Sequence, residues 1–135
     1  MGDVIASIAL RTPGRRMKRL TAYFDSGSPY TFISEAAANR IGEPWELPEP
    51  LRFHGLGGGK FFSRHAIHLT IILKGYPCYH TAYVISEGVI KEDILIGHDF
   101  MQNFNIGLDI RRRKIKIDVS SLKRAQLIRS VAAGQ

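Results

Sequence analysis

The chain has 135 residues, of which 44% are hydrophobic and 23% are charged, and these values are typical of one globular domain. No apolar run approaches the ~20 residues that a membrane-spanning helix needs, and the first residues lack the basic lead of a signal peptide. The single cysteine, Cys78, excludes an internal disulfide and suits a reducing compartment. We therefore expect no membrane partner, and a location in the cytoplasm, as this chain alone or as a soluble domain of a longer protein.

The net charge of +7 is concentrated in two clusters of basic residues, each of which surrounds a predicted turn. Long basic side chains at a turn are simply solvated. No aromatic residues that could stack on bases and no zinc motif accompany them, so nucleic-acid binding is the weaker explanation of the charge. The clusters are Arg11, Arg15, Arg16, Lys18 and Arg19, and Arg111, Arg112, Arg113, Lys114 and Lys116.

A hairpin opens the chain. The apolar run Val4–Leu10 predicts a buried strand, Thr12-Pro13-Gly14 predicts a turn, and Met17–Phe24 predicts the returning strand. The second strand leads into Asp25, and a charge at the end of an apolar strand is costly unless backbone donors receive it. Small residues follow that suit such a turn, because glycine reaches conformations that other residues avoid and serine hydrogen-bonds locally. These residues are Ser26, Gly27 and Ser28.

A short strand and a helix come next. Tyr30–Ile33 has β-branched and aromatic character, which predicts a strand. Ser34 is a typical N-cap for the alanine-rich segment behind it, and Gly42 ends that helix. The segment Glu43–Pro50 holds three prolines, so we expect an extended linker in which Trp45 is a packed anchor.

A glycine-rich hairpin occupies the middle of the chain, with apolar arms on either side of the tip. So many glycines are costly in chain entropy, which indicates a mobile loop or a close approach of the backbone to something else. No helix pattern and no Lys-Ser/Thr pair follows, so a phosphate-binding loop is not favoured. The tip residues are Gly55, Leu56, Gly57, Gly58 and Gly59.

The second half of the chain continues with strands. Apolar residues alternate from Ile67 to Leu73, which predicts a long strand, and Cys78–Ile85 predicts its return after a turn. His65 and His68 would lie on opposite faces of that long strand, so we do not expect them to share a metal, and no metal or cofactor is predicted.

Another short apolar strand ends in glycine; it consists of Ile94, Leu95, Ile96 and Gly97. A two-turn helix should follow, with Phe100 and Phe104 stacked on its buried side. A hairpin then surrounds the second basic turn, and residues 121–133 predict a helix that Ser121 caps.

The order of these features resembles the retropepsin-type aspartic proteases, the group of retroviral and retrotransposon proteases and their bacterial and archaeal relatives. The segments that carry the resemblance are Tyr23–Ser28, His54–Gly59 and Asp93–Phe100, and together they span about residues 4–119. The resemblance implies an all-β, single-lobe acid-protease fold, that is, a closed barrel with two short helices and a C-terminal helical tail. Residues 1–119 would form the protease domain and residues 120–135 a basic helical extension.

The resemblance also implies a chemistry that needs two copies of the chain. Two adjacent carboxylates share one proton, so that one can activate a water while the other hydrogen-bonds the carbonyl of the scissile peptide bond. Asp25 is followed by Ser-Gly, and no other aspartate precedes such a pair, so each subunit of a homodimer would contribute its Asp25. The expected activity is that of an aspartic endopeptidase acting on a peptide or protein substrate, without a cofactor.

The family assigns roles to the remaining residues of these motifs. Ser26 would bond across the dimer axis, Gly27 would line the substrate cleft, and Ser28 could donate to the outer carboxylate oxygen of Asp25 and favour activity at lower pH. Gly55–Gly59 would form the flap that closes over an extended peptide. Ile94–Gly97 would pass behind the catalytic turn and support it.

The sequence also departs from the family pattern. Retroviral members often pair an acidic residue just after the catalytic turn with an arginine after the later glycine, and this chain has Pro29 or Tyr30 and His98 in those places. No short terminal strands are evident for interleaving two subunits. A non-catalytic peptide-binding or dimerisation module on the same fold is therefore the alternative.

Overall fold

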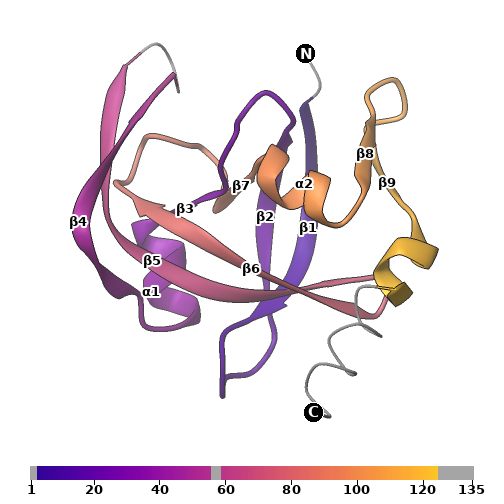
Figure 1. Cartoon of the computed structure of the whole chain (residues 1–135), viewed down its shortest axis with the longest axis horizontal. Helices are drawn as coiled ribbons and strands as arrows, with labels where there is room; N and C mark the ends of the chain where they lie inside the picture. The colour runs from indigo at the N-terminus through magenta and orange to yellow at the C-terminus, as the bar shows by residue number, and fades with distance from the viewer. Residues whose placement is uncertain (1–2, 56–58, 125–135) are drawn as a thin grey trace.

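The computed structural model describes residues 3–55 and 59–124, and it is built mainly from β-strands (Figure 1). Two short helices interrupt the strands. In chain order the elements are β1 (Asp3–Arg11), β2 (Lys18–Asp25), β3 (Phe32–Ser34), α1 (Glu35–Ile41), β4 (Trp45–His54), β5 (Lys60–Leu73), β6 (Tyr76–Ile85), β7 (Ile94–Ile96), α2 (His98–Asn103), β8 (Ile106–Asp109) and β9 (Lys114–Ile117).

Six of the strands close into a ring. The sheet has the order β1-β2-β7-β3-β6-β5-β4, and β1 also pairs with β5 through Ala9–Arg11, so the ring closes with β4 outside it. β8 and β9 form a separate two-stranded sheet. The prediction of an all-β closed barrel with two short helices is confirmed.

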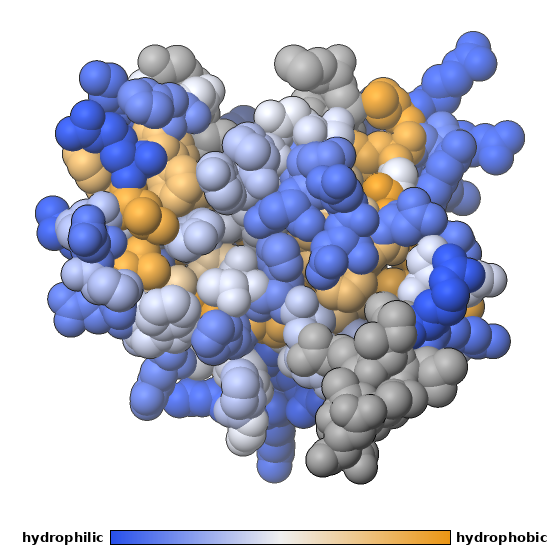
Figure 2. Space-filling view, in the orientation of Figure 1, coloured by the Kyte–Doolittle hydropathy of each residue, from blue (hydrophilic) through white to orange (hydrophobic). Residues whose placement is uncertain are grey.

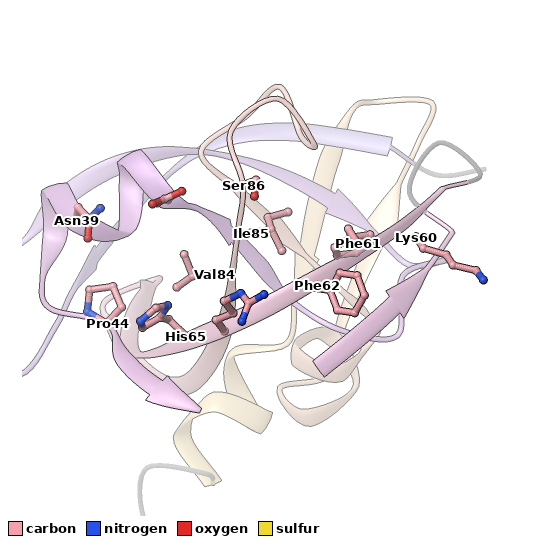
Figure 3. Close-up of a pocket in the computed structure, with 11 residues that line it drawn as sticks. Asn39, Pro44, Lys60, Phe61, Phe62, His65, Val84, Ile85 and Ser86 are labelled. Atoms are coloured by element: carbon pink, nitrogen blue, oxygen red, sulfur yellow. The ribbon is translucent and has the colours of Figure 1, made fainter. Parts of the chain in front are cut away.

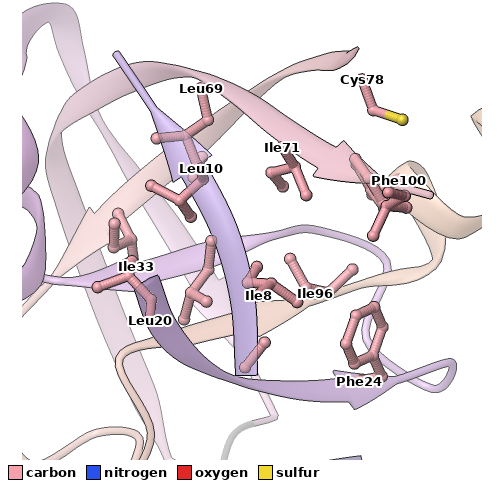
Figure 4. Packing of buried hydrophobic residues seen from close by; sticks show 14 of the residues in the cluster. Ile8, Leu10, Leu20, Phe24, Ile33, Leu69, Ile71, Cys78, Ile96 and Phe100 are labelled. Atoms are coloured by element: carbon pink, nitrogen blue, oxygen red, sulfur yellow. The ribbon is translucent and has the colours of Figure 1, made fainter. Parts of the chain in front are cut away.

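Alternation of side chains explains how the strands fill this ring. In β2, Leu20, Ala22 and Phe24 are buried, whereas the residues between them are exposed or half-buried. The inward residues of β1, β5 and β7 meet them in one core, which also receives Phe100 from α2 (Figure 4). Burial of a large apolar side chain contributes about 1.5–3 kcal/mol, so this core supplies the main stabilisation of the barrel.

The two helices are anchored as the sequence predicts. The Ser34 side chain accepts a hydrogen bond from the Ala37 N–H at 3.2 Å, which caps α1, and the helix ends at Gly42. In α2, the Phe100 and Phe104 rings lie 4.8 Å apart and face the core. No helix in the described part of the chain is long and apolar enough to cross a membrane.

The segment predicted as a linker is instead the start of β4. Trp45 and Glu46 pair with β5, the register shifts, and pairing resumes at Leu51. The prolines fit because the outer edge of β4 has no partner strand among the described residues, and an edge strand tolerates residues without an N–H. Trp45 is not a packed anchor: it remains 39% exposed, and its ring lies 5.4 Å from that of His68.

The single cysteine is buried, whereas the two basic clusters are exposed to solvent. Cys78 is buried, and desolvation raises its pKa to about 11, so the thiol stays protonated at neutral pH. The residues of both basic clusters are exposed, and the face seen in Figure 2 is largely hydrophilic.

The last described residues pack onto the barrel. Residues 119–124 are helical, and Asp118 caps them, because its side chain accepts from the Ser120 and Ser121 N–H groups. The prediction that Ser121 caps this helix is therefore wrong. Leu122 is only 2% exposed and belongs to the main core, while the predicted continuation to residue 133 lies outside the described residues.

We expect Leu122→Ala to lower the free energy of unfolding by about 2–5 kcal/mol, as for other buried leucines. The matched control is Val119→Ala on the same helical turn, where the side chain is 37% exposed and the change should stay within about 0.5 kcal/mol. Urea unfolding of both variants measures the difference. An equally small loss of stability in both variants would show that Leu122 does not belong to the folded core.

Candidate active site

Asp25 stands at the end of β2. The neighbour of β2 in the sheet is β7, the strand that was predicted to support the Asp25 turn. β7 lies between β2 and β3: Leu95 is opposite Tyr23 in a parallel pair and opposite Phe32 in an antiparallel pair. All three residues of β7 are buried. The loop from Asp25 to Thr31 therefore leaves the sheet on one side of β7 and re-enters it on the other.

The turn after Asp25 supplies one backbone donor to its carboxylate and a second to its main-chain carbonyl. The Gly27 N–H donates to Asp25 Oδ1 at 2.9 Å, and the Ser28 N–H donates to the Asp25 carbonyl at 3.1 Å. The side chain of Asp25 remains half-buried. Gly27 does not have a positive φ, unlike Gly55, so the turn does not use the conformational freedom expected of this glycine.

Ser28 does not donate to the Asp25 carboxylate. The residue is 7% exposed, and its hydroxyl donates to the Tyr30 carbonyl at 2.8 Å, so it closes the loop on itself. The predicted role of Ser28 in stabilising the ionised carboxylate is therefore wrong in this structure. Ser26 is exposed.

Gly97 lies against the backbone of this loop. A Cβ atom at Gly97 would stand 2.1 Å from the Tyr30 carbonyl oxygen and 2.8 Å from that of Ser28, so no larger residue fits without displacing the backbone. The next residue, His98, donates its N–H to the Ser28 carbonyl at 2.7 Å. The end of β7 thus supports the turn that carries Asp25.

Asp99 holds the far end of the same loop. Its carboxylate accepts from the Thr31 hydroxyl at 2.7 Å, from the Thr31 N–H at 3.2 Å and from the Phe100 N–H at 2.8 Å. The Nε2 atom of His80, on β6, lies 3.0 Å from Asp99 Oδ2. Thr31 is fully buried, and its hydroxyl also accepts from the Gly97 N–H at 3.1 Å.

These contacts decide the ionisation of Asp99. Burial acts to raise its pKa, but the hydrogen bonds from His80 and Thr31, the positive charge of His80 when it is protonated and the Phe100 N–H together lower it. The net effect is a pKa below the ordinary value for aspartate. Asp99 is therefore ionised at neutral pH, which suits its position in the first turn of α2.

A pocket of about 350 Å³ opens in front of Asp25. Gly27 and Tyr30 line it from the loop, and Phe53 and Gly55 line it from the first arm of the glycine-rich hairpin. Aromatic rings join these two walls: the Tyr30 and Phe53 centroids lie 5.3 Å apart. The hairpin thus lies across a pocket from the carboxylate, which is where a flap would stand.

A larger pocket of about 650 Å³ lies elsewhere, where β5 separates from β6 beside α1 (Figure 3). Asn39 borders it from α1, and Phe62 and His65 border it from β5. Asp25 and the loop after it do not line this pocket. His68 lines a different pocket.

The structure brings together most of the residues that the sequence singles out. Asp25, Gly27, Ser28 and Gly55 line one pocket, and Ile94–Gly97 lie behind it. Leu56, Gly57 and Gly58 lie outside the described residues. Gly59 is exposed, and its carbonyl accepts a backbone hydrogen bond from the Gly55 N–H at 3.1 Å.

Sequence reasoning missed three polar residues: Thr31, His80 and Asp99. Asp99 falls in the motif Asp93–Phe100, but its spacing from Thr31 and His80 gives no signal without a fold. Within residues 3–55 and 59–124, no three His, Cys, Asp or Glu side chains are grouped as metal ligands would be.

Comparison with known proteins agrees with this architecture. No family model matches the sequence, and no curated protein does. Solved structures do match, and they show that the fold is that of the retropepsin-like proteases.

Two of these structures cover most of the chain. The retroviral protease-like domain of Ddi1 from Leishmania major superposes with a TM-score of 0.61 at 19% identity, over 87% of this chain and 90% of that one. The EIAV protease, in complex with the inhibitor HBY-793, gives a TM-score of 0.59 at 18% identity, over 78% of this chain and 90% of that one. At such identities the similarity concerns the fold alone, so a bacterial or archaeal origin stays a prediction.

We expect Gly97→Ala to destabilise the protein by about 3 kcal/mol or more, because the added methyl group meets backbone rather than a side chain that can move. Gly107→Ala in β8 is the control, since the nearest atom to its Cβ would be 3.7 Å away, in ordinary contact. Thermal and urea unfolding measure both variants. Similar stabilities for the two would contradict the close approach at Gly97.

The lowered pKa of Asp99 predicts how its contribution to stability depends on pH. A carboxyl whose folded pKa lies below the unfolded value of about 3.9 stabilises the protein above that pH and loses the effect as the pH falls through the folded pKa. The difference in unfolding free energy between the parent protein and Asp99→Asn should therefore be largest at neutral pH and shrink below about pH 4. Urea titrations between neutral and acidic pH test this, and a difference that does not change with pH would contradict it.

Proposed function

We propose that the protein is an aspartic endopeptidase of the retropepsin type, active as a homodimer. The observation that carries the proposal is the position of Asp25: a half-buried carboxylate on a loop held from behind, facing a pocket across which the glycine-rich hairpin lies. The fold shared with retroviral protease-like domains supports the same conclusion.

The proposed chemistry uses one Asp25 from each subunit. Two carboxylates held close together cannot both ionise, so they share a proton and titrate as one unit. The ionised carboxylate takes a proton from a water molecule, which attacks the peptide carbonyl, while the protonated carboxyl donates a hydrogen bond to the carbonyl oxygen. The Gly27 N–H, which donates to Asp25 Oδ1, keeps that oxygen oriented in each subunit.

The hairpin would supply substrate binding. Its arms pair through Phe53 and Phe61, and Phe53 packs against Tyr30 and Phe32 beside the catalytic loop. An extended peptide between the loop and this hairpin would be held by main-chain hydrogen bonds, and closure of the hairpin would exclude water.

The second candidate is a non-catalytic peptide-binding module on the same fold. It is favoured by the absence, in this chain, of the acidic residue and arginine that support many retroviral dimers, since Pro29 or Tyr30 and His98 stand there instead. Binding without cleavage would distinguish it from the enzyme.

Asp25→Asn should abolish peptide hydrolysis, with a loss of about 10³-fold or more, because a neutral amide cannot activate water. The assay is mass spectrometry of products from a mixture of unstructured peptides across acidic and neutral pH, with a pepstatin-like inhibitor as a second test. The control is Asp118→Asn, which should retain activity. Asp118 caps the start of helical residues 119–124 and does not line the pocket.

Activity per chain should also rise with protein concentration as dimers form, and sedimentation at the same concentrations measures the dimer directly. Cleavage that survives Asp25→Asn would exclude the proposed mechanism. If the parent protein and Asp25→Asn bind peptides equally and neither forms products, the protein is the binding module.

A further inference from the structure

Residues 97–99 hold the loop that carries Asp25 at two points. At its middle, the Ser28 carbonyl accepts from the His98 N–H. At its end, Thr31 is held by Asp99 through both its hydroxyl and its N–H, and by the Gly97 N–H. The Tyr83 N–H of β6 also donates to the Thr31 carbonyl at 3.0 Å, so Asp99 is the partner that binds the Thr31 hydroxyl and N–H together.

Asp99 is itself oriented from another strand. His80 projects from β6, its Nε2 atom lies 3.0 Å from Asp99 Oδ2, and its ring meets the Phe100 ring edge-on at 5.3 Å. Both partners are shielded, with the His80 side chain 15% exposed and that of Asp99 26% exposed. With donors from Thr31, Phe100 and His80, both oxygens of the carboxylate are occupied and its rotation is restricted.

All of these groups belong to one subunit. The network connects β6, α2 and the catalytic loop without any contribution from a second chain. Retroviral relatives often carry an acidic residue and an arginine in this region, and this chain lacks both. His98 stands in the place of the arginine, and Asp99 directly follows it.

We propose that Asp99 is a positioning residue for Asp25 and that His80 holds Asp99 in the orientation this role requires. The catalytic loop then takes its working shape within a single subunit, before two copies meet. The proposal rests on the proposed function, since the position of Asp25 matters for catalysis only if Asp25 is catalytic.

The first test is kinetic. Asp99→Asn places an amide NH₂ against groups that donate hydrogen bonds, so kcat per folded dimer should fall about 10- to 100-fold while KM changes little, as expected when a catalytic group shifts by a fraction of an ångström. His80→Phe, which keeps ring packing but removes the donor, should lose kcat in the same way. His80→Gln, which can still donate to Asp99, should recover most of the lost kcat.

Two controls separate positioning from general stability. Asp118→Asn makes the same chemical change in another hydrogen-bonded aspartate, and Leu122→Ala destabilises the core without touching the loop. Both should keep the parent kcat once the folded fraction is measured. A parent-like kcat in Asp99→Asn, or an equal loss in Leu122→Ala, would overturn the proposal.

The second test needs no activity. In an Asp25→Asn background, diluted until sedimentation shows monomers, amide hydrogen exchange should find the Thr31 and Gly97 N–H groups protected. Addition of Asp99→Asn should reduce that protection about tenfold or more relative to the amide of Ile71 in the barrel, which reports global opening. Asp118→Asn should not change it.

The outcomes of the two tests distinguish the two proposals. Loss of protection in a protein that never cleaves peptides would leave the loop network standing and remove the protease function. Absence of protection at Thr31 in the monomer, or protection that survives Asp99→Asn, would overturn the network whether or not the protein is a protease.

Discussion

The structure depends on how the irregular loop between β2 and β3 is held. Residues 25–31 contribute few bonds to one another, so the groups that fix them must come from elsewhere. Three consecutive residues provide several of them: Gly97 by its lack of a side chain, His98 by its N–H and Asp99 by its carboxylate. The Tyr83 N–H of β6 adds a bond to the Thr31 carbonyl. Their position follows from β7, which is buried between β2 and β3 and ends directly behind the loop.

Charge burial and hydrogen bonding are balanced differently at the two aspartates of this region. Asp99 lies deeper in a polar network and keeps its charge because donors surround it. Asp25 receives one backbone N–H and faces the pocket. The first arrangement suits a residue whose charge must stay constant, whereas the second leaves the Asp25 carboxylate open to the pocket.

Aromatic packing connects the loop to the hairpin in front of it. Phe53 lies 4.9 Å from Phe32 and 5.5 Å from Phe61, centroid to centroid, so the base of the hairpin and the end of the loop share one apolar cluster. This cluster is separate from the main core of the barrel. The base of the hairpin is therefore fixed to the end of the loop that carries Asp25.

The sequence predicted the elements whose pattern is local. Alternation in β2 and β5, the Ser34 cap and the Phe100–Phe104 pair all depend on neighbours in the chain, and the structure has them. The closed barrel was predicted from a family resemblance, and the order of the motifs along the chain carries that resemblance.

The wrong predictions involve partners that are distant in sequence or alternative partners nearby. Trp45 was predicted as a packed anchor in a linker, whereas it lies in β4, which pairs on one edge only, and stays partly exposed. Ser28 has the Tyr30 carbonyl within reach and uses it instead of the Asp25 carboxylate. His80 and Asp99 are separated by 19 positions and meet only because β6 passes beside α2, which no spacing rule reveals.

The outer edge of β4 has a consequence for how copies of this protein behave at high concentration. An unpaired strand edge in a β-rich protein is a template on which another chain can add a strand and begin to aggregate. Pro48 and Pro50 lie in the part of β4 where the register shifts, and neither has an N–H with which to bind a further strand. The barrel that closes on itself thus leaves one strand outside, and the proline pair makes that strand a poor site for growth of a larger sheet.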